Sequence, residues 1–225
     1  MKGSVQTNAL RVIAMVAMFS SQLLAQGTPT APASTAPKSA GAPASAAWAY
    51  SLTIDGYVVP DGDSYASPVF TADRNWLHLE ARYNYEDQRT ASLWIGRNFS
   101  AGKKLQLAVT PMIGAVFGDI TGIVPGYELS LTYKKVQFSS SNEYVFDTGN
   151  SANSFFYSWP EITYSPVDWF KVGLVAQHTK AFHTSLDTQR GFLVGFSHKK
   201  VEFTTYILGP GWADPTAVLE VGVSF

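Results

Sequence analysis

The feature that most constrains this chain is an alternation of apolar and polar residues that runs through most of Trp48–Phe225. In Trp76–Tyr85, one face carries Leu77, Leu79, Ala81, Tyr83 and Tyr85, and the other carries His78, Glu80, Arg82 and Asn84. Successive side chains of a β-strand point to opposite faces, so this period of two indicates strands with one apolar and one polar face. No stretch reaches the roughly 18 consecutive apolar residues of a membrane helix. The sequence therefore predicts an all-β fold.

Turn signals between the alternating runs divide this region into twelve predicted strands. They are Trp48–Val59, Tyr65–Ala72, Asn75–Tyr85, Thr90–Phe99, Lys104–Phe117, Ile123–Tyr133, Val136–Phe146, Phe155–Tyr164, Trp169–Ala181, Gly191–His198, Val201–Gly209 and Thr216–Phe225. The second is short and contains Pro68, so a count of ten is the alternative. Pro111 and Pro160 also fall inside strands, where a residue without an N–H must lie at a bulge or a gap in the ladder.

The first 25 residues have the layout of a secretory signal peptide. Lys2 and Arg11 give a basic start, Val12–Phe19 is an apolar run too short to span a bilayer, and small residues near Ala25 suit cleavage. A buried amphipathic helix is the alternative interpretation. We expect export and cleavage near Ala25.

Residues 26–47 are built from Ala, Pro, Ser, Thr and Gly with one charge, Lys38. Such a segment cannot bury enough apolar surface to offset the entropy of ordering. It is predicted to be a disordered linker, either a tether or a remnant of the leader. The domain organisation is then a signal peptide over 1–25, a linker over 26–47 and a β-domain over 48–225.

Composition excludes several functional classes. The chain has no cysteine, which removes disulfides, thiolate metal sites and thiol catalysis. Its formal net charge of −1 offers no basic surface for nucleic acid. Motifs for phosphate, calcium or zinc are absent, so we expect no cofactor and no metal.

Alternation alone does not decide which face meets solvent. A soluble sandwich or lipocalin-like barrel buries its apolar face, whereas a membrane barrel turns it to lipid. Export without disulfides, strands long enough to cross a bilayer, and aromatic residues near strand ends such as Tyr127 and Tyr133 favour the membrane barrel. A chain end at Phe225, with Val223, Val221 and Leu219 on the same face, favours it too.

These features resemble those of bacterial outer-membrane β-barrel proteins, in particular small porin-like barrels. Proteins of that group commonly end in an aromatic residue preceded two positions earlier by an apolar one, as Phe225 and Val223 do here. The resemblance implies that this strand, with Val221, is the signal read by the barrel-assembly machinery. Glu220 stands where the group usually has glycine, and Gly222 is displaced. The resemblance implies a closed antiparallel transmembrane barrel in the outer membrane.

Charge is segregated between the two ends of the predicted barrel. If both chain ends face the periplasm, the pairs Lys103-Lys104, Lys134-Lys135 and Lys199-Lys200 all fall at periplasmic turns. The opposite side collects Asp61, Asp63, Glu86, Asp87, Asp119, Asp147, Asp187 and Asp214. Lysines suit anionic phospholipid head groups, and the carboxylates could share divalent ions with lipopolysaccharide. Polar turns in general would look similar.

The polar faces of the strands supply the candidate lumen-lining residues. They are His78, Glu80, Arg82, Trp94, Glu128, Trp159, Glu161, Lys171, Glu202 and Glu220. Buried charges must pair or face water, so these groups either form a cross-strand ion-pair network or line a water-filled path. Both readings remain open at this point.

The sequence offers no catalytic residues. His78 and Glu80 are the only base-and-orienter pair on one face, and no serine lies beside them. We therefore expect a narrow pore for passive or weakly selective passage of small solutes and not an enzyme. The alternative is a structural barrel that anchors the envelope, and a lipid-modifying enzyme is a more distant third. The solute and the oligomeric state are not indicated.

Overall fold

The computed structural model describes residues 47–58, 64–181, 187–209 and 215–225. The predictions of a signal peptide over 1–25 and of a linker over 26–47 lie outside these residues, apart from Ala47. The same is true of Asp61, Asp63 and Asp214.

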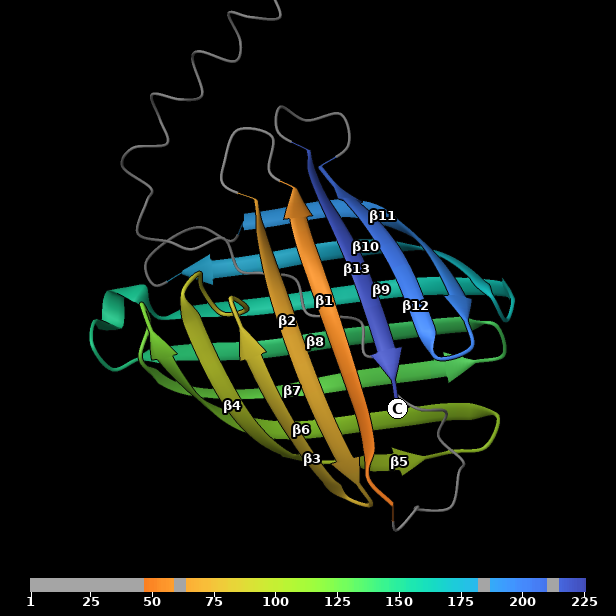
Figure 1. Cartoon of the computed structure of the whole chain (residues 1–225), viewed down its shortest axis with the longest axis horizontal. Coiled ribbons are helices and arrows are strands. Elements are labelled where there is room, and N and C mark those ends of the chain that lie inside the picture. Colours follow the sequence, from red (N-terminus) through yellow and green to blue (C-terminus); the bar gives the residue numbers. More distant parts are fainter. Residues whose placement is uncertain (1–46, 59–63, 182–186, 210–214) are drawn as a thin grey trace, which may run out of the picture.

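The described chain forms one antiparallel sheet that closes on itself (Figure 1). Its strands are β1 (Ala49–Val58), β2 (Tyr65–Arg74), β3 (Leu77–Tyr83), β4 (Thr90–Arg97), β5 (Phe99–Ala101), β6 (Leu105–Gly118), β7 (Gly122–Tyr133), β8 (Val136–Asp147), β9 (Phe155–Val167), β10 (Phe170–Ala181), β11 (Asp187–His198), β12 (Val201–Leu208) and β13 (Thr216–Ser224). A short 3₁₀ turn, η1 (Ser151–Asn153), precedes β9. The described part of the chain contains no helix long and apolar enough to cross a membrane.

The barrel wall is twelve strands around, as the sequence predicts, and not ten, when β4 and β5 are counted as one interrupted strand. β4 and β5 both pair with β6 and are separated only by Asn98, so they occupy one position in the wall. The sequence predicts a single strand there, over Thr90–Phe99. The first and last strands close the ring, with Ser51 opposite Ser224 and Val58 opposite Ala217. A closed sheet leaves no edge, which is the condition for strands to stand in lipid.

The prolines inside strands lie where the ladder is interrupted, as predicted. Pro68 pairs with Ile54 of β1, but the pairing of β2 with β3 begins only at Val69. Pro111 pairs with Tyr127 and lies opposite the break between β4 and β5. Pro160 falls in the gap of the β9–β10 ladder. The missing N–H therefore leaves no partner unsatisfied on that side.

The outer face of the barrel is apolar, whereas the interior holds polar and charged side chains together with a cluster of buried apolar ones. Large exposed side chains in mid-strand include Leu93, Ile113, Leu174 and Phe203, and Leu174 is 64% exposed. Their neighbours along the strands point inward, and these include polar side chains such as Ser92 beside Leu93 and apolar ones such as Val175 beside Leu174. A water-soluble protein buries its apolar face, so this arrangement excludes a soluble sandwich and fits a wall that faces acyl chains.

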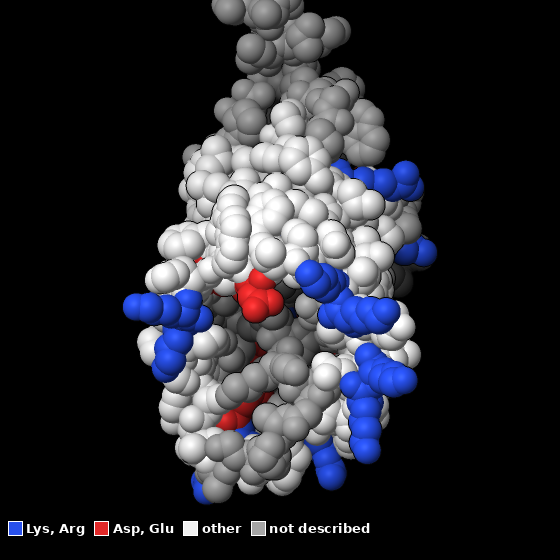
Figure 2. All heavy atoms as spheres, turned by 90° about the vertical axis from the view of Figure 1, so that its right-hand side faces the viewer, with Lys and Arg blue, Asp and Glu red and all other residues white. Residues whose placement is uncertain are grey.

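One end of the barrel is ringed by cationic side chains. The turns β5–β6, β7–β8 and β11–β12 meet at this end and carry the three Lys-Lys pairs, all exposed. Figure 2 shows Lys and Arg around this mouth, with Asp and Glu recessed within it. Exposed aromatic rings accompany them, and the guanidinium of Arg97 lies over the rings of Trp76 and Phe99. Among the described carboxylates, Glu86, Asp87, Asp119, Asp147 and Asp187 lie towards the opposite end.

The structure corrects one assignment of faces. Tyr85 is predicted to continue the apolar face of Leu77–Tyr83, but β3 ends at Tyr83. The chain then turns inward, and Tyr85 is 1% exposed beneath the guanidinium of Arg82. The period of two fails there because it holds only while the backbone stays extended.

Candidate functional site

The interior of the barrel is the candidate site, and it is acidic. Among the described residues, the carboxylates that point inward or are buried at its ends are Asp55, Asp73, Glu80, Glu86, Glu128, Glu143, Asp147, Glu161, Glu202 and Glu220. The basic side chains there are His78, Arg82 and Lys171. Carboxylates therefore outnumber basic groups. All but Asp147, which bonds residues of the turn at η1, fall into two clusters.

The first cluster is an ion network that crosses the interior. His78 on β3 contacts Asp73 through Nδ1 at 2.9 Å and Glu80 through Nε2 at 3.2 Å. Arg82 donates from Nε to Glu80 Oε1 at 2.7 Å and from Nη1 to Glu143 Oε2 at 2.8 Å. Since Glu143 belongs to β8, this ion pair ties β3 to the facing wall.

Aromatic rings hold Arg82 in this position. Its guanidinium carbon lies 4.0 Å from the centre of the Tyr85 ring and 4.3 Å from that of Trp94. A cation over aromatic faces is stabilised by their quadrupoles, most strongly where water is excluded. Trp94 in turn donates from Nε1 to Ser92 Oγ at 2.9 Å and to Glu86 Oε1 at 3.2 Å. Arg82 is thus a fixed strut across the barrel.

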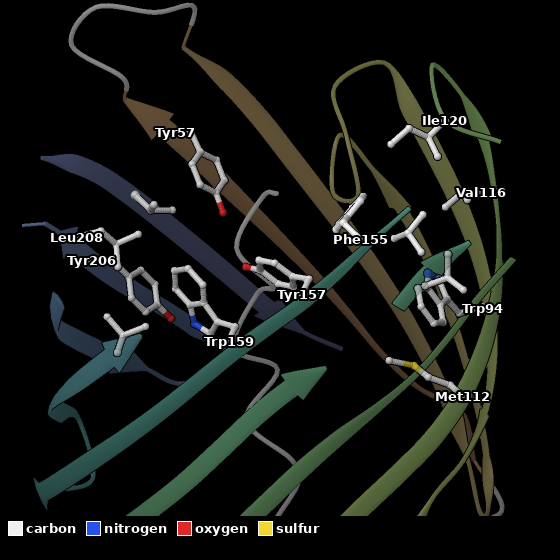
Figure 3. Close-up of a cluster of buried hydrophobic side chains, with 14 of the residues drawn as sticks. Tyr57, Trp94, Met112, Val116, Ile120, Phe155, Tyr157, Trp159, Tyr206 and Leu208 are labelled. Carbon is white, nitrogen blue, oxygen red and sulfur yellow. The ribbon is translucent and has the colours of Figure 1, made fainter. Parts of the chain in front are cut away.

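The second cluster lies on β1, β9, β10, β12 and β13. Lys171 Nζ pairs with Glu202 Oε1 at 2.5 Å. Trp159 donates from Nε1 to Glu161 Oε1 at 2.6 Å, and Tyr206 donates to Glu220 Oε2 at 3.2 Å. Figure 3 shows Trp159 and Tyr206 together in the interior, with Tyr57 and Tyr157 nearby. The rings of Trp159 and Tyr206 meet edge to face at 5.6 Å.

Asp55 belongs to the second cluster and has no hydrogen-bond partner. It is 1% exposed, and neither carboxylate oxygen is bonded within the described structure. It lies directly opposite Glu220 in the β1–β13 ladder and interacts electrostatically with Glu161 as well. Opposed like charges destabilise a sheet, and an unpaired buried charge is costly.

A cavity connects this cluster with the cationic mouth. It measures about 120 Å³, and its lining includes Glu161, Lys171 and Glu202 from the interior and Asp168 and Ser197 near the turns. Gly195 faces the Lys171 side chain, which would collide with a Cβ there. The space beside Lys171 is therefore preserved by the absence of a side chain.

Three titratable groups at the opposite mouth lie in turns outside the strands. Burial raises the pKa of the Glu86 carboxyl, which Arg82, Ser92 and Trp94 only partly counteract. Burial also raises the pKa of Asp87. The hydrogen bond to Asp119 raises the pKa of the exposed Arg89 guanidinium. This mouth therefore keeps Arg89 charged and opposes ionisation of the two carboxyls.

The surroundings of His78 do not suit a general base. Both ring nitrogens of His78 are occupied by carboxylates, so neither can take a proton from a nucleophile. The described residues include no group of three or more His, Cys, Asp or Glu side chains arranged to hold a metal ion.

The residues that the sequence predicts to line the lumen all lie in the interior but fall into two groups. His78, Glu80, Arg82, Trp94 and Glu128 lie in or beside the first cluster, and Trp159, Glu161, Lys171, Glu202 and Glu220 lie in the second. Sequence reasoning missed Asp55, Asp73, Glu86, Glu143 and Tyr206. The period of two in β1, β2, β8 and β12 places four of them inward, whereas Glu86 lies in a turn and carries no such signal.

An apolar exterior, a closed antiparallel wall and a charged interior define a transmembrane-type β-barrel. Comparison with known proteins agrees at the level of fold. The sequence matches no protein-family model and no curated protein. Among solved structures, the KdgM porin is similar, with a TM-score of 0.54 over 78% of this chain and 99% of that chain, at 11% identity. OpdQ of Pseudomonas aeruginosa is a weaker match, with a TM-score of 0.42 at 9% identity over 75% of this chain and 57% of that one. The chain has an outer-membrane porin-like fold.

Proposed function

We propose that this protein is a narrow outer-membrane pore through which small solutes pass passively or with weak selectivity. The observation that carries the proposal is a charged interior with a cavity at the lysine-bearing end, inside a wall whose exterior is apolar. Buried charges without full pairing are costly unless water reaches them, so the excess of interior carboxylates favours a hydrated path. The porin-like fold supports the same function.

The interior chemistry argues against a preference for anions. One of the similar structures is described as the KdgM porin in complex with disordered oligogalacturonate, a ligand that carries many carboxylates. The present interior is itself rich in carboxylates, with Arg82 engaged by Glu80 and Glu143. A polyanion would be repelled here, so we do not extend that ligand to this chain.

Planar-bilayer recording tests the proposal directly. Purified protein should give discrete current steps, and the reversal potential in a salt gradient should show selectivity for cations. Arg82→Ala should enlarge the steps, because Arg82 spans the interior between β3 and β8. The exposed Arg89→Ala serves as the matched control and should leave step size unchanged. Persistent silence of well-folded protein would contradict a pore.

A second function is favoured by the same strut. Because Arg82 ties opposite walls between two aromatic rings, the interior is closed at that level in the direction of the strut. A barrel that only anchors or organises the envelope needs no open path. Silence of both the native protein and Arg82→Ala would support this alternative.

A further inference from the structure

We propose that Asp55, Glu161 and Glu220 form a binding site for a small organic cation that carries an ammonium or guanidinium group. The role of this site in passage rests on the proposed pore, whereas its occupancy by a cation does not. In the described structure the three carboxylates share one region of the interior, and Asp55 interacts electrostatically with both of the others.

The site is incomplete without a positive charge. Neither oxygen of Asp55 has a hydrogen-bond partner, and Glu161 Oε2 has none either. Asp55 and Glu220 are 1% and 2% exposed, so water does not compensate them fully. Lys171 is paired with Glu202 Oε1 at 2.5 Å and also interacts electrostatically with Glu161 and Glu220. Within the described structure, Asp55 is therefore the carboxylate of the three that no basic side chain balances. A buried cluster of this kind is stabilised by a ligand that donates N–H groups or positive charge.

Aromatic side chains line the same region. Tyr57 is buried on the same face of β1 as Asp55, Trp159 donates to Glu161, and Tyr206 donates to Glu220. Figure 3 shows these rings reaching the interior from β1, β9 and β12. Aromatic faces next to carboxylates are the surroundings that organic cations prefer. The same protein already places Arg82 between rings and carboxylates in its first cluster.

A metal ion fits less well than an organic cation. No group of three or more acidic or histidine side chains in the described residues has the spacing of a metal site. Hard cations also require several oxygens at close range. An ammonium or guanidinium is larger, reaches carboxylates that are farther apart and packs against rings. Glu161 also lines the cavity at the cationic mouth, so one edge of the site borders that cavity.

Equilibrium binding to the full chain in detergent micelles tests the site. The probe is n-butylguanidinium, and N-butylurea is a neutral compound of nearly the same shape. Tryptophan fluorescence and the urea midpoint of unfolding report binding. We expect saturable binding of n-butylguanidinium alone, weakened by about tenfold or more in Asp55→Asn and in Glu220→Gln. Asp119→Asn, which removes an exposed carboxylate at the other mouth, should change affinity by less than about twofold.

Two results would overturn the site. Equal binding of the urea and the guanidinium would show that charge is not recognised. Unchanged affinity in Asp55→Asn would show that the carboxylates hold protons among themselves. Asp55→Asn removes an unpaired buried charge, so the variant should unfold at a higher urea concentration than the native protein. A loss of binding in a variant that is more stable cannot be explained by misfolding. If the protein binds n-butylguanidinium but never conducts, the pore is contradicted and the cation site stands. If it conducts but does not bind the cation, the site is contradicted and the pore stands.

Discussion

Gly114 on β6 lies directly beneath the indole ring of Trp94, which packs flat against the wall at this position. A Cβ atom at residue 114 would come within 2.5 Å of Trp94 Cδ2. No side chain other than hydrogen fits without moving the ring. Trp94 in turn packs against the guanidinium of Arg82. The position of Arg82 therefore depends on the lack of a side chain at Gly114, two strands away.

Gly114→Ala should therefore destabilise the barrel by about 1–3 kcal/mol, the usual effect of overpacking. Urea unfolding in detergent measures the change. Gly56→Ala is the matched control, because a Cβ there meets only Leu219 O at 3.6 Å, which is ordinary contact. Equal losses in the two variants would mean that strand glycines matter for the backbone and not for the Trp94 ring.

Glu86 makes stability depend on pH in a predictable direction. Burial raises its pKa in the folded state above the ordinary 4.5. At pH values below 4.5, the carboxyl of Glu86 is protonated in both the folded and the unfolded state, so Glu86 adds no pH dependence to the free energy of unfolding. As the pH rises, the unfolded chain releases its proton first, so stability is lost. Glu86→Gln should remove this loss, and its advantage over the native protein should grow from about zero at pH 4 towards neutral pH in urea titrations. An advantage that is constant with pH would contradict it.

Individual residues were predictable where they stand on extended backbone. Alternation places Glu80, Arg82 and Glu161 inward, but it says nothing of partners, because Arg82 meets Glu143 61 residues later. Which carboxylate remains without a partner, as Asp55 does, follows only from the closed register. The predicted face of Tyr85 was wrong because Tyr85 lies in the turn that follows β3, where the backbone is no longer extended.

At the scale of the strands, the sequence predicted all twelve positions in the wall, because turn residues separate the alternating runs from one another. Boundaries shifted where a strand continued through polar residues, as β11 begins at Asp187 and not Gly191. The break at Asn98 was not predicted, since no glycine or proline marks it. Pro111 on the facing strand is its only trace in the sequence.

The two faces of a strand should respond differently to charge. Leu174 on β10 is 64% exposed on the outer face, so Leu174→Arg should destabilise the protein by about 2–4 kcal/mol in lipid vesicles. Thr132 on β7 points inward and is half-buried, opposite Gln106 and Gln137. Thr132→Arg should cost less, because the interior offers water and carboxylates. Similar losses at both positions, measured by urea unfolding in vesicles, would contradict an outer face in contact with lipid.

Taken as a whole, the molecule has a dipolar distribution of charge along its axis. Lysine pairs ring one mouth, carboxylates gather at the other, and the interior between them is acidic. Closure of β1 against β13 was predictable, since an open edge in lipid leaves backbone groups unsatisfied. The direction of insertion is a separate question, because the fold alone is compatible with either orientation.

The charge distribution predicts that the lysine mouth faces the periplasm, where anionic phospholipid head groups attract it. The chain has no cysteine, so single replacements report position cleanly. Ala152→Cys lies exposed on η1 at the acidic mouth, and Lys103→Cys lies exposed in the β5–β6 turn. A membrane-impermeant maleimide should label Ala152→Cys on intact cells and Lys103→Cys only after permeabilisation. The reverse pattern would invert the orientation. Equal labelling of both only after permeabilisation would remove the protein from the outer membrane, because one mouth of an outer-membrane barrel must meet the medium.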